Sequence, residues 1–180
     1  MVDARIFYAG ATVAAFLYLF HNLFIPLPDY DSALYAQVAR ELYEANDFSR
    51  LTFYGEPFLD KPHMHYWLSA LSFRLFGVSD FAYRLPSFLA LLSSAFVMYR
   101  WCSQFVDNPT SAWQVVVVFS TSMAMLLMAY DVRLEPLLLL FNLLTIWQFT
   151  RWLQDKKNHN LFISVAAVAA GYYTKGAIAV

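Results

Sequence analysis

Long apolar runs recur along the chain, and polar residues gather between them. Five runs approach the ~20 residues that a helix needs to cross a bilayer. They cover residues 6–27, 85–101, 112–130, 136–152 and 161–180. The first is longer than the ~7–15 residues of a signal-peptide core, and no small-residue cleavage site precedes Asp29. The pattern therefore predicts a multispan bundle whose first span is not cleaved.

Residues 28–84 form a charged, proline-marked insert between the first two runs. Residues 31–45 place apolar side chains at helical spacing, namely Leu34, Val38, Leu42 and Ala45. Residues 54–57, Tyr-Gly-Glu-Pro, predict a turn. Pro62 then opens a second helix that continues to Phe76 and ends at Gly77. Both helices are rich in aromatic residues and leucine, so we expect them to lie at the membrane interface.

Composition supports the membrane assignment. Hydrophobic residues make up 60% of the chain and charged residues 14%, whereas soluble domains carry about a quarter charged residues. The net charge of −1 gives no basic field for nucleic acid. The single cysteine, Cys102, has no partner for an internal disulfide. The expected fold class is an all-α integral membrane bundle with a long outer loop.

Basic residues predict the orientation of this bundle. They fall at the N-terminus and in alternate loops: Arg5, Arg100, Arg151, Lys156 and Lys157. By the positive-inside rule these segments are cytoplasmic. The opposite face then receives the acid-rich insert, the 131–135 turn and the end of the fifth run. Charged residues beside a bilayer are costly unless they line a wet site, so this outer face is the predicted site.

The predicted outer face gathers ionisable residues close to the ends of the spans. These are Asp31, Asp60, Lys61, His63, His65, Asp131, Arg133, Glu135 and Lys175. Carboxylates in such a pocket can accept a proton from an attacking hydroxyl. Lysine and arginine can stabilise a departing phosphate. The combination suits a reaction on a charged, lipid-borne substrate.

Several of these residues also have a purely structural explanation. Asp31 is well placed to interact with a helix dipole, and Lys61 could extend along the interface to reach water. Arg133 and Glu135 could form a loop ion pair. His63 and His65 are two residues apart and point to different faces of a helix, which disfavours a joint metal site.

The insert contains an ordered set of short motifs. It runs Asp31-x-x-x-Tyr35-Ala, Ala39-Arg40-Glu41-Leu, Tyr54-Gly55, Asp60-Lys61-Pro62, Tyr66-Trp67-Leu68, Leu75-Phe76-Gly77 and Arg84-Leu85-Pro86. This set resembles the first outer loop of membrane glycosyltransferases that use lipid-phosphate sugars. The bacterial aminoarabinose transferases are most similar, and the protein O-mannosyltransferases are more distant. No single motif is specific, but their order and the matching topology are.

The resemblance implies a GT-C fold and an inverting sugar transfer from a polyprenyl-phosphate donor to a periplasmic lipid A-like lipid, glycan or protein. Asp31 and Glu135 fall on the family's catalytic acids. The resemblance places Lys61 near the lipid phosphate and Lys175 on the family's Lys-Gly element. Tyr35, Arg133 and His65 are further predicted substrate contacts. Asp60 falls where the family can bind a divalent metal. The implied location is a bacterial inner membrane, with the site facing the periplasm or exterior.

Two other functions are compatible with the sequence. A transporter or flippase would show intramembrane charges, but here the charges gather at one face. The chain could also act as a scaffold or as one half of a split enzyme. Family members carry further C-terminal spans and a soluble domain, so a C-terminal partner subunit would be expected in that case. The sequence ends within an apolar run, which leads us to expect a fragment or a truncated reading frame.

Overall fold

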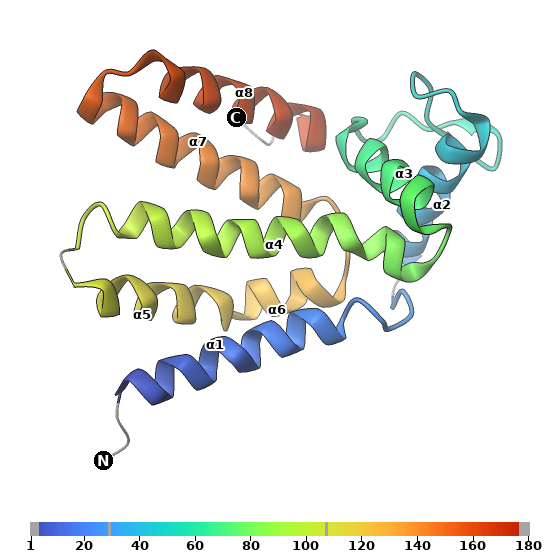
Figure 1. The fold of residues 1–180 in the computed structure, drawn as a ribbon. Helices are drawn as coiled ribbons and strands as arrows, with labels where there is room; N and C mark the ends of the chain where they lie inside the picture. The colour runs from blue at the N-terminus through green and yellow to red at the C-terminus, as the bar shows by residue number, and fades with distance from the viewer. Residues whose placement is uncertain (1–3, 29, 107, 177–180) are drawn as a thin grey trace.

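The computed structural model describes residues 4–28, 30–106 and 108–176, and this part of the chain is mostly helical. Most of the helices lie side by side in one row (Figure 1). The order across the row is α8, α7, α4, the pair α5 and α6, and α1. Their bounds are α1 (Ala4–His21), α4 (Asp80–Cys102), α5 (Pro109–Ser120), α6 (Met123–Tyr130), α7 (Glu135–Asp155) and α8 (Asn158–Lys175). The helices α2 (Tyr30–Ala45) and α3 (Met64–Phe76) pack together at one end of the row.

The two helices predicted in the insert are present. Residues 52–57 between them form a hairpin of two short strands, β1 (Thr52–Phe53) and β2 (Glu56–Pro57), so the fold is not purely helical. Tyr54 and Gly55 occupy its tip with φ of 51° and 81°. This pair of positive values is typical of a type I′ turn, which matches the twist of the strands. Gly77 ends α3 at φ 79°, as predicted.

The first apolar run is helical for only part of its length, because α1 ends at His21 rather than near residue 27. Asn22 donates its side-chain amide to the carbonyl of Tyr18 at 2.7 Å, which satisfies a carbonyl at the helix end. Pro26 and Pro28 follow, and the residue before a proline avoids helical geometry. Residues 22–28 are therefore an apolar but irregular connection that leads into α2.

The second predicted span begins earlier than expected, at Asp80 rather than residue 85. Ser79 caps α4 by accepting a hydrogen bond from the backbone N–H of Ala82 at 3.2 Å. Pro86 lies inside the helix, one residue after the start that the apolar run predicts. The early start puts Tyr83 and Arg84 on α4.

The third predicted span is broken into α5 and α6, which meet at 52°. Thr121 and Ser122 donate their hydroxyls to the carbonyls of Val117 and Phe119, each at 2.7 Å. Such bonds compete with the helical ladder and bend helices. Ser122 also caps α6 by accepting from the backbone N–H of Met125. The Ser-Thr-Ser sequence therefore accounts for the break.

Within the described residues, one helix, Asp80–Cys102, is long and apolar enough to cross a bilayer unaided. The bent pair Thr110–Ser120 and Met123–Tyr130 supplies a second if it crosses as one span, and Ile6–His21 is a shorter apolar helix. Large apolar side chains along the row are exposed, including Phe16, Val118, Ile146 and Phe162. The five-span topology itself stays a prediction, and residues 177–180 of the fifth run lie outside the described part.

Candidate functional site

Arg133 lies at the centre of the site, between two acids from different parts of the chain. Its Nη1 donates to Asp31 Oδ2 at 2.7 Å, and its Nε lies 2.6 Å from Asp131 Oδ2. Ser32 donates its hydroxyl to the other oxygen of Asp131 at 2.5 Å. These contacts join the first turn of α2 to the turn between α6 and α7. All of these carboxylates and the guanidinium are partly exposed, so a ligand can reach them.

Two further ion pairs complete the polar cluster. Lys61 Nζ lies 3.0 Å from Asp60 Oδ2 in the connection before α3. Lys175, in the last turn of α8, donates to Glu135 Oε1 at 2.6 Å in the first turn of α7. The hydrogen bond to Asp60 raises the pKa of Lys61, with burial opposing it. Lys61 is therefore a fixed cation at this end of the molecule.

Tyr35 is buried close to the charged groups of these ion pairs. Its ring packs edge-on against Phe58 and Tyr66, and the side chain is almost fully buried. Burial raises the pKa of its phenol, while the nearby charge of Lys61 lowers it. The charges of Asp31, Asp60 and Glu135 also act on this phenol. The structure thus brings eight predicted site residues to the end of the row where α2 and α3 pack: Asp31, Tyr35, Asp60, Lys61, Asp131, Arg133, Glu135 and Lys175.

His65 occupies a different position from the one predicted for a substrate contact. Its side chain is fully buried, and Nε2 hydrogen-bonds the hydroxyl of Tyr83 at 3.0 Å. Tyr83 donates in turn to the carbonyl of Val132 at 3.3 Å. Burial lowers the pKa of His65 to about 4, so the ring is neutral at pH 7. Through Tyr83, His65 supports the turn that carries Arg133, and it does not line the surface of the site.

A metal ion is not supported by the donors that the described residues provide. Among residues 4–28, 30–106 and 108–176, no three His, Cys, Asp or Glu side chains are grouped so that they could hold one. The carboxylate of Asp60 is already paired with Lys61. The metal contact that the resemblance implies for Asp60 therefore stays a prediction.

Sequence reasoning missed two contributors to the site. Ser32 was not considered, although it holds Asp131 in place. Arg84 was noted only as part of the Arg84-Leu85-Pro86 motif, but its side chain is only 1% exposed and lies in the interior. A serine beside a predicted acid carries no distinctive sequence signal. An arginine that binds backbone carbonyls from distant segments cannot be recognised without the fold.

Comparison with known proteins identifies the family. The profile of the dolichyl-phosphate-mannose-protein mannosyltransferase family matches residues 60–180, which is most of the chain. The chain belongs to this family. The matched segment includes Lys61, Arg133, Glu135 and Lys175, whereas Asp31 lies before it. The resemblance inferred from the insert motifs is thereby confirmed.

Curated relatives include aminoarabinose transferases of bacteria. The undecaprenyl phosphate-alpha-4-amino-4-deoxy-L-arabinose arabinosyl transferase 1 of Proteus mirabilis is 26% identical over 92% of this chain and 32% of its own length. The corresponding Edwardsiella ictaluri transferase is 26% identical over 95% of this chain. The chain therefore spans about a third of the length of these relatives.

Solved structures of ArnT from Cupriavidus metallidurans share the fold. The apo structure and the structure bound to undecaprenyl phosphate each match with a TM-score of 0.67. Both comparisons cover 98% of this chain and 34% of ArnT, at 19% and 20% sequence identity. This chain therefore shares its fold with about a third of ArnT.

Proposed function

We propose that the intact protein transfers a sugar from a polyprenyl-phosphate donor to an acceptor at the outer surface of a bacterial inner membrane. The observation that carries the proposal is the site itself. Three cations, Lys61, Arg133 and Lys175, lie among carboxylates at one end of a row of apolar helices. Such a site can hold a phosphate whose lipid tail remains in the bilayer. The names of the relatives, and the ArnT structure with undecaprenyl phosphate, support this donor class.

The residues divide the chemistry between leaving group and nucleophile. The bond between the anomeric carbon and the phosphate oxygen breaks, and its electron pair stays on the phosphate. Lys61 and Arg133 stabilise the charge that develops there, because oriented cations contribute most where charge grows in the transition state. Attack from the opposite face of the sugar gives inversion at the anomeric carbon.

Asp31 would act on the acceptor. If the acceptor is a hydroxyl, its oxygen bonds to the anomeric carbon and its proton passes to the Asp31 carboxylate. If the acceptor is itself a phosphate, no base is required and Asp31 positions it. Arg133 fixes the orientation of Asp31 through the 2.7 Å contact. Glu135 is the second acid. Its hydrogen bond from Lys175 connects the start of α7 to the end of α8. The acceptor class is a periplasmic lipid A-like lipid, a glycan or a protein.

The test replaces Asp31 with asparagine in the intact protein. Membrane vesicles receive undecaprenyl phosphate bearing radiolabelled aminoarabinose, with lipid A as the acceptor probe. Where the reacting group of the acceptor is a hydroxyl, we expect Asp31→Asn to reduce transfer by about a hundredfold or more, since a positioned general base contributes on the order of 10²–10⁴. Glu44→Gln is the matched control, because Glu44 lies on the same helix and pairs only with the exposed Arg40 in the bonds described. Full transfer by Asp31→Asn, with normal insertion, would remove Asp31 from the mechanism.

A further inference from the structure

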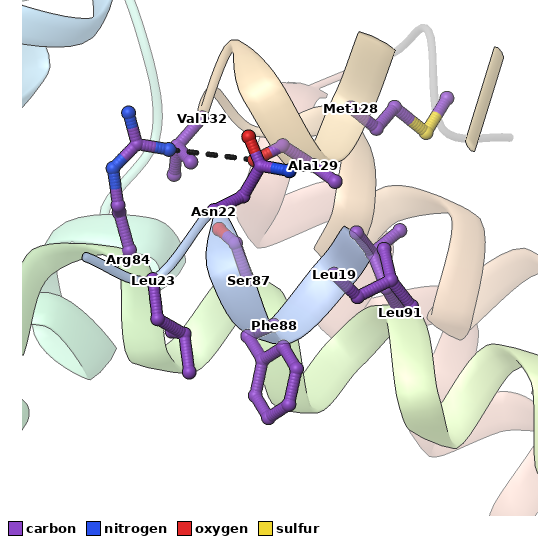
Figure 2. Close-up of a pocket in the computed structure, with 10 residues that line it drawn as sticks. All are labelled: Leu19, Asn22, Leu23, Arg84, Ser87, Phe88, Leu91, Met128, Ala129 and Val132. Atoms are coloured by element: carbon purple, nitrogen blue, oxygen red, sulfur yellow. Dashed lines mark hydrogen bonds between the residues drawn. The ribbon is translucent and has the colours of Figure 1, made fainter. Parts of the chain in front are cut away.

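Arg84 makes an unusual set of contacts inside the bundle, away from the ion pairs of the site. Its Nε donates to the carbonyl of Ile25 at 3.0 Å, and its Nη2 donates to that of Pro26 at 2.8 Å. Its Nη1 donates to the carbonyls of Tyr130 at 3.0 Å and Ala129 at 3.4 Å. Figure 2 shows this guanidinium extending from α4 towards Ala129 and Val132. One side chain therefore binds four backbone carbonyls.

These carbonyls come from two segments that are about a hundred residues apart in sequence. Ile25 and Pro26 belong to the irregular connection after α1, and Ala129 and Tyr130 end α6. Ile25 and Pro26 lie outside any helix, and a helix such as α6 leaves its last four carbonyls without a partner within the helix, so both segments have carbonyls that need other donors. A buried carbonyl without a donor costs free energy, and a bond to a charged donor contributes about 1.5–3 kcal/mol. Arg84 satisfies both segments at once.

Each segment leads directly into the site. Asp31 follows Pro26 by five residues, and Asp131 follows Tyr130 immediately. Across the site, Arg133 and Ser32 join the same two stretches through Asp31 and Asp131. The two stretches are thus connected twice. Arg84 connects them by hydrogen bonds within the bundle, and the polar contacts of the site connect them at its end. The connection through Arg84 uses only backbone acceptors, so it persists when a ligand rearranges the charges of the site.

We propose that Arg84 is a positioning residue that sets the separation between Asp31 and the Asp131–Arg133 pair. The planar guanidinium is suited to this role because its five N–H donors point in fixed directions along two edges. The Nε and Nη2 edge binds the connection after α1, while Nη1 binds the end of α6. A lysine ammonium carries its donors at one point and cannot bind both segments in the same way. The proposal rests on the proposed function only where transfer is measured.

Hydrogen exchange of the intact protein in detergent tests the positioning directly and needs no activity. In Arg84→Lys we expect amides of residues 22–28 and 129–135 to exchange together about tenfold faster or more, the effect of losing one charge-assisted bond. Amides in the middle of α4 and α7 should keep their rates. Arg74→Lys is the matched control, since Arg74 is an exposed arginine on α3, and it should leave both segments unchanged.

Transfer kinetics provide the second measurement. Arg84→Lys should lower kcat by about tenfold or more while the KM for the lipid donor changes little, because Lys61 and Arg133 remain. In Arg84→Gln, the side-chain amide has two donors on one nitrogen. At least one of the two segments, 22–28 or 129–135, should therefore exchange faster in this variant too. Unchanged exchange in both segments would overturn the proposal. A uniform rise across α4 and α7 in both variants would also overturn it, because Arg84 would then support the whole bundle. Altered exchange with no transfer by the unsubstituted protein would instead contradict the proposed function.

Discussion

At the scale of single residues, the site depends on partners that are far apart in sequence. Asp60 and Lys61 are neighbours, so their pairing could be expected from the sequence. Asp31 and Arg133 are 102 residues apart, and Glu135 and Lys175 are 40 apart. Sequence analysis could place these groups on one face, because the spans fix which loops share an end. It could not assign partners, since pairing depends on how the helices pack.

His65 shows the same limit, because its burial was not visible in the sequence. The folded protein holds the ring neutral with a pKa of about 4, whereas an unfolded histidine has a pKa near 6.5. The unfolded chain therefore binds a proton first as the pH falls. Stability is fully present above about pH 6.5 and decreases between there and about pH 4.

Thermal unfolding in detergent measures this effect. We expect the midpoint to fall as the pH is lowered from 7 to 5, with His65 contributing up to about 3 kcal/mol across its whole titration range. In His65→Gln this part of the pH dependence should disappear, although the variant is less stable at pH 7. His63→Gln is the matched control. The same pH dependence in His65→Gln as in the unsubstituted protein would contradict the assignment.

At the scale of secondary-structure elements, the hairpin of the insert is held by one carboxylate. Glu41 on α2 accepts from the Thr52 hydroxyl at 2.7 Å and from the backbone N–H of Tyr54 at 2.8 Å and of Gly55 at 3.3 Å. Although burial opposes it, these bonds and one from Gln37 lower the pKa of Glu41. The turn was predicted from Gly and Pro, but its anchor required the fold, because Glu41 looks like any polar residue of an amphipathic helix.

Glu41→Gln should loosen the hairpin without unfolding the bundle. The amide has one acceptor oxygen in place of two, so about 1–2 kcal/mol of local stability is lost. Limited proteolysis should then cut residues 46–60 several-fold faster. Glu44→Gln on the same helix should not change the rate, because an exposed helical ion pair contributes little. Equal cutting rates for Glu41→Gln and the control would show that the hairpin is held by other contacts.

The boundaries of the helices were less predictable than their existence. Pro86 and the Ser-Thr-Ser sequence at 120–122 both lie within apolar runs. Hydropathy alone does not show that the first is tolerated inside α4 while the second breaks α5 from α6. At the break, Thr121 and Ser122 bond their hydroxyls to backbone carbonyls, and Ser122 also caps the new helix α6.

At the scale of the whole molecule, the row of helices has two distinct ends. The turns at 103–106 and 156–157 lie at one end of the row, and α2 and α3 lie at the other (Figure 1). The ion pairs of the site are at the α2–α3 end. The alternation of charged loops predicted this arrangement, because successive spans must return the chain to the same side. The sequence predicts the basic end to be cytoplasmic.

Thiol labelling tests this orientation. Glu56 lies in β2 of the insert hairpin, Ser103 directly follows α4, and both are exposed. Each is replaced by cysteine in a Cys102→Ser background. In intact cells, a membrane-impermeant maleimide should label Glu56→Cys and leave Ser103→Cys unlabelled until the cells are opened. Reversed labelling would place the site in the cytoplasm, and equal labelling would show that the chain does not cross the membrane.

The break between α5 and α6 has a consequence for the lipid around the protein. At ~1.5 Å per residue, the 12 residues of α5 and 8 of α6 would reach ~30 Å if collinear. A 52° bend shortens that end-to-end reach by roughly 3 Å. Hydrophobic mismatch of this size is relieved by local thinning of the bilayer. The Asp131–Arg133 turn would then meet a lowered headgroup layer, and a lipid phosphate could reach it without its tail leaving the hydrocarbon.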